Sequence, residues 1–190
     1  MYNTLIVTSS QNSIDFFSKM LTAADVSSID ICQNGGDARR LLLERPFDIV
    51  VINAPLADET GESLARHIAA KGQTQVILAV AGEHFEALSA SCEDAGVLTI
   101  AHPIDREIFW RTLKLACAAH ARFAKLSAQD DKLKQKVADI KLNDRAKWLL
   151  MSYLGMTEHE AHRHIEKQAM DKRLTKRAVA EGIINTYEEA

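Results

Sequence analysis

Eight lysine and arginine side chains lie close together near the C-terminus, between residues 145 and 177. They are Arg145, Lys147, Arg163, Lys167, Lys172, Arg173, Lys176 and Arg177. Residues 120–184 carry 14 Lys and Arg against 9 Asp and Glu, whereas residues 1–119 carry 9 against 15. An acidic front and a basic back indicate that only the back part meets a polyanion. Such a set can bind nucleic-acid phosphates; the alternative is a helix surface that is rich in lysine for solubility alone.

The other reactive residue types do not form a catalytic or metal-binding pattern. The three cysteines are scattered and odd in number, without disulfide or zinc spacing: Cys32, Cys92 and Cys117. Three neighbouring histidines project in different directions if they lie on a helix: His159, His162 and His164. The sequence has no glycine-rich phosphate loop and no nucleophile–base pair at a recognisable spacing. We therefore expect no metal, no cofactor and no enzymatic activity.

The basic segment is predicted to lie on helices, because it contains the start and stop signals of three short helices. Gly155 suits the left-handed end of a first helix. Thr157 and Glu160 have the spacing of a capping box that starts a second helix, and Thr175 can cap a third. The predicted apolar faces are Ala161, Ile165 and Ala169, and then Val179, Ala180, Ile183 and Ile184.

The segment resembles the ANTAR domain, the RNA-binding module of AmiR/NasT-type transcription antitermination regulators. The matching residues are Arg145-Ala146-Lys147, Leu149-Leu150-Met151, Gly155, Glu158, Glu160-Ala161, Ala169-Met170 and Val179-Ala180. The resemblance implies that residues 145–190 bind paired stem-loops in leader mRNA through the eight basic residues, and so disfavour the terminator hairpin. Trp148 departs from the family pattern. For Trp148 we favour packing in the helical core or against a partner helix over stacking on a base.

Residues 1–119 alternate apolar runs with amphipathic stretches. Strands are predicted at 5–7, 28–32, 48–52, 75–80 and 97–101, and helices at 14–24, 36–44, 61–70, 83–94 and 105–120. This alternation predicts an α/β domain with a five-stranded parallel sheet covered by helices on both faces. In such sheets, ligands collect at the carboxyl ends of the strands.

The pattern resembles the flavodoxin-like (CheY-like) receiver domain of bacterial response regulators, but its chemical positions are changed. The loop after the first strand reads Thr8-Ser9-Ser10, where a receiver has the carboxylates that hold magnesium. Asn53 stands at the position of the phosphoacceptor aspartate, Val80 at that of the switch hydroxyl, and His102 at that of the lysine before a cis-proline. We therefore predict a pseudo-receiver that is not phosphorylated at the usual position. A phosphorelay regulator with a displaced acceptor remains an alternative.

The segment at 120–144 has a seven-residue repeat. Its apolar seam holds Phe123, Leu126, Leu133, Val137 and Ile140, with Asp130 and Asp144 also on seam positions. Apolar residues at this spacing over three heptads predict a coiled coil that makes a homodimer, with Asp130 weakening the pairing but fixing its register. The alternative is a long helix packed on its own pseudo-receiver. Without Pro or Gly between His120 and Leu154, we expect one unbroken helix.

Three domains are thus expected: a pseudo-receiver at 1–119, a coiled-coil helix at 120–144 and an ANTAR domain at 145–190. No apolar run approaches the roughly 20 residues that span a bilayer, and the first residues do not form a signal peptide, so we expect a cytoplasmic protein without membrane contact. Because the phosphoacceptor is missing, we expect control by a ligand-sensing negative regulator protein. A protein-interaction module that has lost RNA binding is the remaining alternative.

Overall fold

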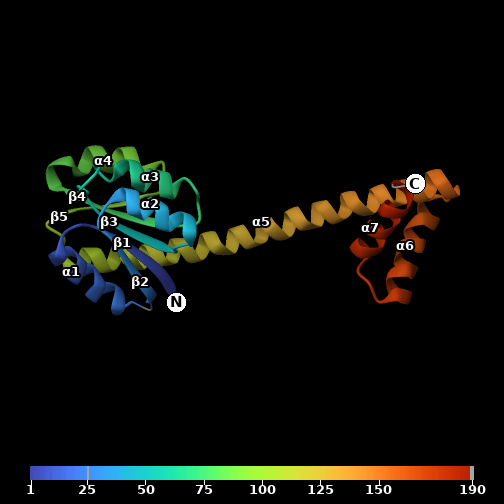
Figure 1. Ribbon diagram of the computed structural model, residues 1–190, viewed down its shortest axis with the longest axis horizontal. Helices are drawn as coiled ribbons and strands as arrows, with labels where there is room; N and C mark the ends of the chain where they lie inside the picture. Colours follow the sequence, from blue (N-terminus) through green and yellow to red (C-terminus); the bar gives the residue numbers. More distant parts are fainter. Residues whose placement is uncertain (25, 189–190) are drawn as a thin grey trace. The chain divides into compact units, whose positions relative to one another are not determined.

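The computed structural model describes residues 1–24 and 26–188 of the chain (Figure 1). These form two compact units, Met1–Leu126 and a second that begins at Ser127. One continuous helix, α5 (Arg106–Leu154), contributes its first part to one unit and its second part to the other. The prediction of an unbroken helix through 120–154 is confirmed. None of the described helices has the length and apolar composition to cross a membrane.

The first unit is built on a parallel five-stranded sheet. Its strands are β1 (Tyr2–Val7), β2 (Val26–Cys32), β3 (Ile49–Asn53), β4 (Gln75–Ala81) and β5 (Leu98–His102). Their spatial order is β2-β1-β3-β4-β5, the order of flavodoxin-like folds. Every residue of β3 is buried, as expected for a central strand covered on both faces.

Helices cover both faces of this sheet (Figure 1). The helices are α1 (Gln11–Thr22), α2 (Gly35–Glu44), α3 (Glu62–Ala69), a short 3₁₀ turn η1 (Gly82–His84), α4 (Phe85–Glu93) and the start of α5. Alternate residues of β1 and β3 feed two cores. One core joins the sheet to α2, α3 and α4 through Ala38, Leu64 and Cys92. The other joins it to α1 and α5 through Phe17 and Phe109. This confirms the predicted fold class.

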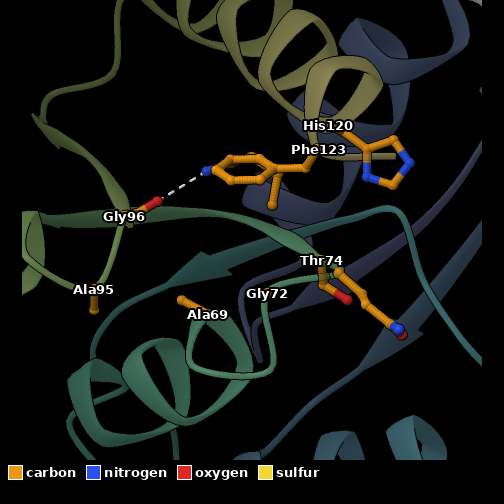
Figure 2. A pocket seen from close by; sticks show the side chains of 9 residues that line it. Ala69, Gly72, Thr74, Ala95, Gly96, His120 and Phe123 are labelled. Atoms are coloured by element: carbon orange, nitrogen blue, oxygen red, sulfur yellow. Dashed lines mark hydrogen bonds between the residues drawn. The ribbon is translucent and has the colours of Figure 1, made fainter. Parts of the chain in front are cut away.

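A small cavity of about 60 Å³ lies in the first unit beside Gly72 and Gly96, which precede β4 and β5 (Figure 2). His120 and Phe123 of α5 line it, and His120 Nε2 lies 3.2 Å from an oxygen of Asp48. This volume suits a few water molecules rather than a cofactor. It also lies away from the carboxyl ends of the strands, where the chemical positions of a receiver are found.

The second unit consists of the end of α5, α6 (Glu158–Lys172) and α7 (Lys176–Glu188). Gly155 ends α5 with φ +65°, and the Thr157–Glu160 capping box starts α6. The Ala178 amide donates to Thr175 Oγ1 at 3.2 Å, so Thr175 caps α7. The predicted faces of α6 and α7 pack on α5, in a core formed by Ala146, Leu149, Leu150, Ala161, Ile165, Ala169, Val179, Ala180 and Ile183.

Candidate functional site

The carboxyl ends of β1, β3 and β5 bring Thr8, Asn53 and His102 together. Asn53 Nδ2 donates to Thr8 Oγ1 at 3.1 Å, and Asn53 Oδ1 lies 2.7 Å from His102 Nε2. Because the amide oxygen can only accept, His102 Nε2 carries the proton of this bond. Three of the predicted receiver positions thus form one hydrogen-bonded group.

The two other predicted receiver positions stay outside this group. Val80 is buried in the sheet, and Ser9 is exposed. One member was missed from the sequence: Ser13 on α1, whose hydroxyl accepts from Asn53 Nδ2 at 3.2 Å. The sequence could have pointed to Ser13 only through its position in the first turn of the helix that follows the Thr8 loop.

The Asn53 network does not have the groups needed for phosphoryl transfer. Its side chains are two hydroxyls, an amide and an imidazole, and Asn53 is 9% exposed. A magnesium ion prefers carboxylate oxygens, and an amide cannot form an acyl phosphate. Among the described residues, no group of three His, Cys, Asp or Glu side chains is placed to hold a metal ion.

Carboxylates near this end of the sheet have other hydrogen-bond partners. Asp58, in the loop after β3, accepts from the Gly35 and Gly36 amides at 2.8 and 2.9 Å. These two backbone bonds lower the pKa of Asp58 below its usual value. The Asp58 carboxylate therefore anchors its loop to the N-terminus of α2, which does not favour Asp58 as a displaced phosphoacceptor.

In the second unit, Lys147 and Arg177 are each paired with two carboxylates. Lys147 Nζ lies 2.9 Å from Asp144 and 3.0 Å from Glu158, and its side chain is only 17% exposed. Arg177 bonds both Asp139 on α5 and Glu181 on α7, each at 2.8 Å. The hydrogen bonds to Asp144 and Glu158 raise the pKa of Lys147, and those to Asp139 and Glu181 raise that of Arg177. These two cations join neighbouring helices.

Two more candidates have one carboxylate partner each. Arg145 pairs with Glu188, and Lys176 Nζ lies 2.6 Å from Glu166. The hydrogen bond that Arg145 donates to Glu188 raises the pKa of Arg145. Exposed pairs of this kind contribute little to stability and exchange partners easily. Arg145 and Lys176 can therefore still turn to an external anion.

The remaining four candidates have no carboxylate partner among the described residues. Arg163, Lys167 and Arg173 are exposed, and Lys172 Nζ donates to the amide oxygen of Gln168 at 3.0 Å. Arg163 and Lys167 lie one turn apart on α6, on the side opposite its buried residues. This outward side also carries Met170, which is 78% exposed. We call Arg163, Lys167, Lys172 and Arg173 the α6 cationic surface.

The two large aromatic side chains near the end of α5 are both exposed. The prediction that Trp148 packs in the helical core is wrong. The Trp148 side chain lies on the side of α5 away from Leu149 and Leu150 and is 62% exposed. Tyr153 is equally exposed, but its ring lies 5.2 Å from that of Tyr187. Packing of Trp148 against a partner helix stays a prediction.

The predicted seam residues form an exposed apolar row on α5. Phe123, Leu126, Leu133, Val137 and Ile140 are between 51% and 61% exposed. Single apolar side chains at a surface are ordinary, but a row with heptad spacing is typical of a helix that pairs with another. A seam between two chains stays a prediction.

Comparisons with known proteins agree with the two units. The ANTAR domain model matches residues 131–184, so the match begins within the stretch predicted as linker. PdtaR, a transcriptional regulatory protein of Mycobacterium tuberculosis, is 27% identical over 162 residues, which are 83% of this chain and 78% of PdtaR. The same values are found for the protein in strains CDC 1551 / Oshkosh and ATCC 25618 / H37Rv.

The first unit is similar to solved receiver domains. The signal receiver domain of an HD domain-containing protein from Pseudomonas fluorescens Pf-5 matches with a TM-score of 0.55 and 22% identity, over 63% of this chain and 90% of that one. CheY4 of Vibrio cholerae matches with a TM-score of 0.53 and 18% identity, over 61% of this chain and 98% of the CheY4 chain. At these identities the likeness shows the fold alone. The chain thus contains an ANTAR domain behind a receiver-like fold and a long helix, which agrees with its predicted resemblance to AmiR/NasT-type regulators.

Proposed function

We propose that this protein is a transcription antiterminator that binds paired stem-loops in leader mRNA and so prevents the terminator hairpin from forming. The observation that carries the proposal is the α6 cationic surface of the ANTAR domain. It presents Arg163, Lys167 and Arg173 to solvent without carboxylate partners among the described residues. Such cations bind phosphates and release counterions when they do so.

The eight basic candidates then divide by task. The α6 cationic surface contacts RNA, and Arg145 and Lys176 join it by exchanging their exposed carboxylate partners for phosphate. Lys147 and Arg177 hold α5, α6 and α7 in place, since each already bridges two carboxylates. Phosphate contacts fix the position of the module, and arginine forks can also read base edges.

Control of this activity does not pass through phosphorylation in our proposal. Asn53 stands at the acceptor position, hydrogen-bonded to Thr8, Ser13 and His102. A different input must then set the activity, and we propose a ligand-sensing negative regulator protein that binds the pseudo-receiver or α5. The pseudo-receiver carries 15 acidic against 9 basic residues over 1–119, which suits a partner with a basic surface.

We further propose that two chains pair through the apolar row of α5. Removing five exposed apolar side chains from water is favourable, and heptad spacing is the pattern that two helices need to do so. A dimer places two ANTAR domains on two RNA loops. Binding of the second loop then occurs within one complex, which raises the overall affinity without new contacts.

The α6 cationic surface is tested with fluorescence anisotropy on a two-stem-loop RNA at several salt concentrations. The variant Arg163→Ala/Lys167→Ala removes two exposed cations, and the control Lys19→Ala/Lys71→Ala removes two exposed cations from the first unit. The first variant should weaken binding and reduce the slope of log K against log salt by about 1.5, whereas the control should keep both. Equal effects of the two variants would mean that only net charge matters and would refute this surface.

A further inference from the structure

We propose that the groove between α6 and α7 receives one unpaired base of the RNA loop. This inference rests on the proposed function and adds a base-binding site to its phosphate-binding surface. The groove has a volume of about 410 Å³. Apolar side chains contribute to its lining from two elements, Leu150 from α5 and Val179 and Ile183 from α7. A nucleobase has apolar faces and polar edges, so it needs an apolar surface with hydrogen-bonding groups beside it.

The α6 side of the groove supplies those hydrogen-bonding groups. His164, Gln168 and Lys172 line it at successive turns. Lys172 Nζ donates to Gln168 Oε1 at 3.0 Å, and Gln168 Nε2 lies 2.9 Å from His164 Nε2. An amide and an imidazole can both donate to and accept from a base edge. The contacts between them hold the two side chains ready along the groove.

The α7 side leaves room for a planar group. Gly182 lines the groove in the middle of α7, and a Cβ atom built there would meet no atom within 4 Å. A glycine in a helix interior weakens the helix. Packing within the described chain does not require this glycine, and close approach of a ligand is a reason for it.

Charge favours RNA over a protein segment as the occupant. Lys172 lies in the groove, and Arg173 follows it in the chain. Neither has a carboxylate partner among the described residues, Arg173 is exposed, and the Lys172 ammonium contacts Gln168. A phosphate attached to a bound base can reach these cations. An apolar helix in the same place would cover Lys172 without neutralising it, which is costly.

The test combines a groove-filling variant with an RNA that lacks one base. Gly182→Leu fills the groove, and the control Asn185→Leu adds the same side chain to an exposed position of α7 that does not line it. The probe is a two-stem-loop RNA, together with a set in which each loop nucleotide in turn is abasic. The full-length chain is titrated with each RNA by fluorescence anisotropy, and its mass is measured by light scattering.

We expect Gly182→Leu to weaken binding of the intact RNA by about tenfold to a hundredfold, the usual contribution of one stacked base. At one loop position, the abasic RNA should bind wild type as weakly as the intact RNA binds Gly182→Leu. The abasic RNA should bind Gly182→Leu no more weakly than it binds wild type. The slope against salt should fall by no more than about 0.7, because only the phosphate attached to the displaced base loses its contact. The melting temperature should not fall, since leucine favours a helix more than glycine does.

Three results would overturn the inference. The first is that Gly182→Leu binds the intact RNA with wild-type affinity. The second is that the effects of this variant and of the abasic change add at every loop position. The third is that the mass of the Gly182→Leu protein changes while its preference among the abasic RNAs does not. The first two leave the proposed function standing, provided that wild type binds the intact RNA in a salt-dependent way. Absence of wild-type binding to every RNA would instead remove the proposed function, and the groove assignment with it.

Discussion

Asn53 stands at the predicted position of the phosphoacceptor aspartate of a receiver domain. Its amide uses both ends: Nδ2 donates to Thr8 and Ser13, and Oδ1 accepts from His102. His102 stands at the predicted position of the lysine that neutralises phosphate in receivers. In this structure it bonds the neutral amide of Asn53 instead.

His102→Ala should therefore destabilise the protein. It leaves Asn53 Oδ1, in a residue that is 9% exposed, without its partner. A buried unsatisfied polar group costs about 1–3 kcal/mol. The free energy of unfolding, measured with urea, should fall by that amount. His84→Ala, at an exposed position in η1, should leave it unchanged, and similar losses for both variants would contradict the role given to His102.

At the scale of the elements, the loop after β3 is tied to α2. The Asp58 carboxylate accepts from two amides at the start of that helix, and Glu59 pairs with Arg39 of the same helix. A carboxylate at a helix N-terminus is favourable because the backbone amides there have no partners within the helix. This arrangement fixes the loop beside the Asn53 network.

The Asp58 contact predicts a pH dependence. Its pKa is lowered in the folded state, so its stabilising contribution is present above the unfolded pKa of about 4 and is lost as the pH falls below it. The melting temperature of Asp58→Asn should lie below that of wild type at pH 7, and the difference should shrink towards pH 3. Asp94→Asn, at an exposed carboxyl after α4, should show no such trend. A difference for Asp58→Asn that stays constant with pH would contradict this account.

Local signals were readable from the sequence, whereas tertiary partners were not. Gly155 and Thr157 could be placed because helix caps depend on neighbouring residues. Thr8, Asn53 and His102 were identified by the resemblance to receiver domains, and they meet because parallel strands end at one edge of the sheet. Ser13 could not, since its contact depends on how α1 packs.

The pairing of the basic candidates was equally hidden. Arg177 and Asp139 are 38 positions apart in the chain, and their contact exists only once α7 packs on α5. The sequence showed eight similar cations, and the structure separates paired from unpaired ones. Core packing of Trp148 was wrong for a related reason, because its position on α5 faces away from α6 and α7.

For the whole molecule, the apolar row of α5 predicts a dimer. Leu133→Asp/Ile140→Asp places two charges on the proposed seam, where they would have to be buried. Sedimentation should show a shift from dimer to monomer. The affinity for a two-loop RNA should fall to that for a single loop, by about a hundredfold or more. Ala128→Asp/Gln135→Asp, on an outer position of the same helix, should change neither. A monomeric wild type, or a dimer that survives the seam variant, would contradict the coiled coil.

In the proposed function, this protein binds RNA without phosphorylation. The most direct test is to titrate a two-stem-loop leader RNA with purified protein whose intact mass shows no phosphate, before and after incubation with acetyl phosphate and magnesium. We expect tight, salt-dependent binding in the first titration, an unchanged mass after the incubation and the same affinity in the second titration. A phosphate adduct that is required for binding would contradict the claim and restore a displaced acceptor.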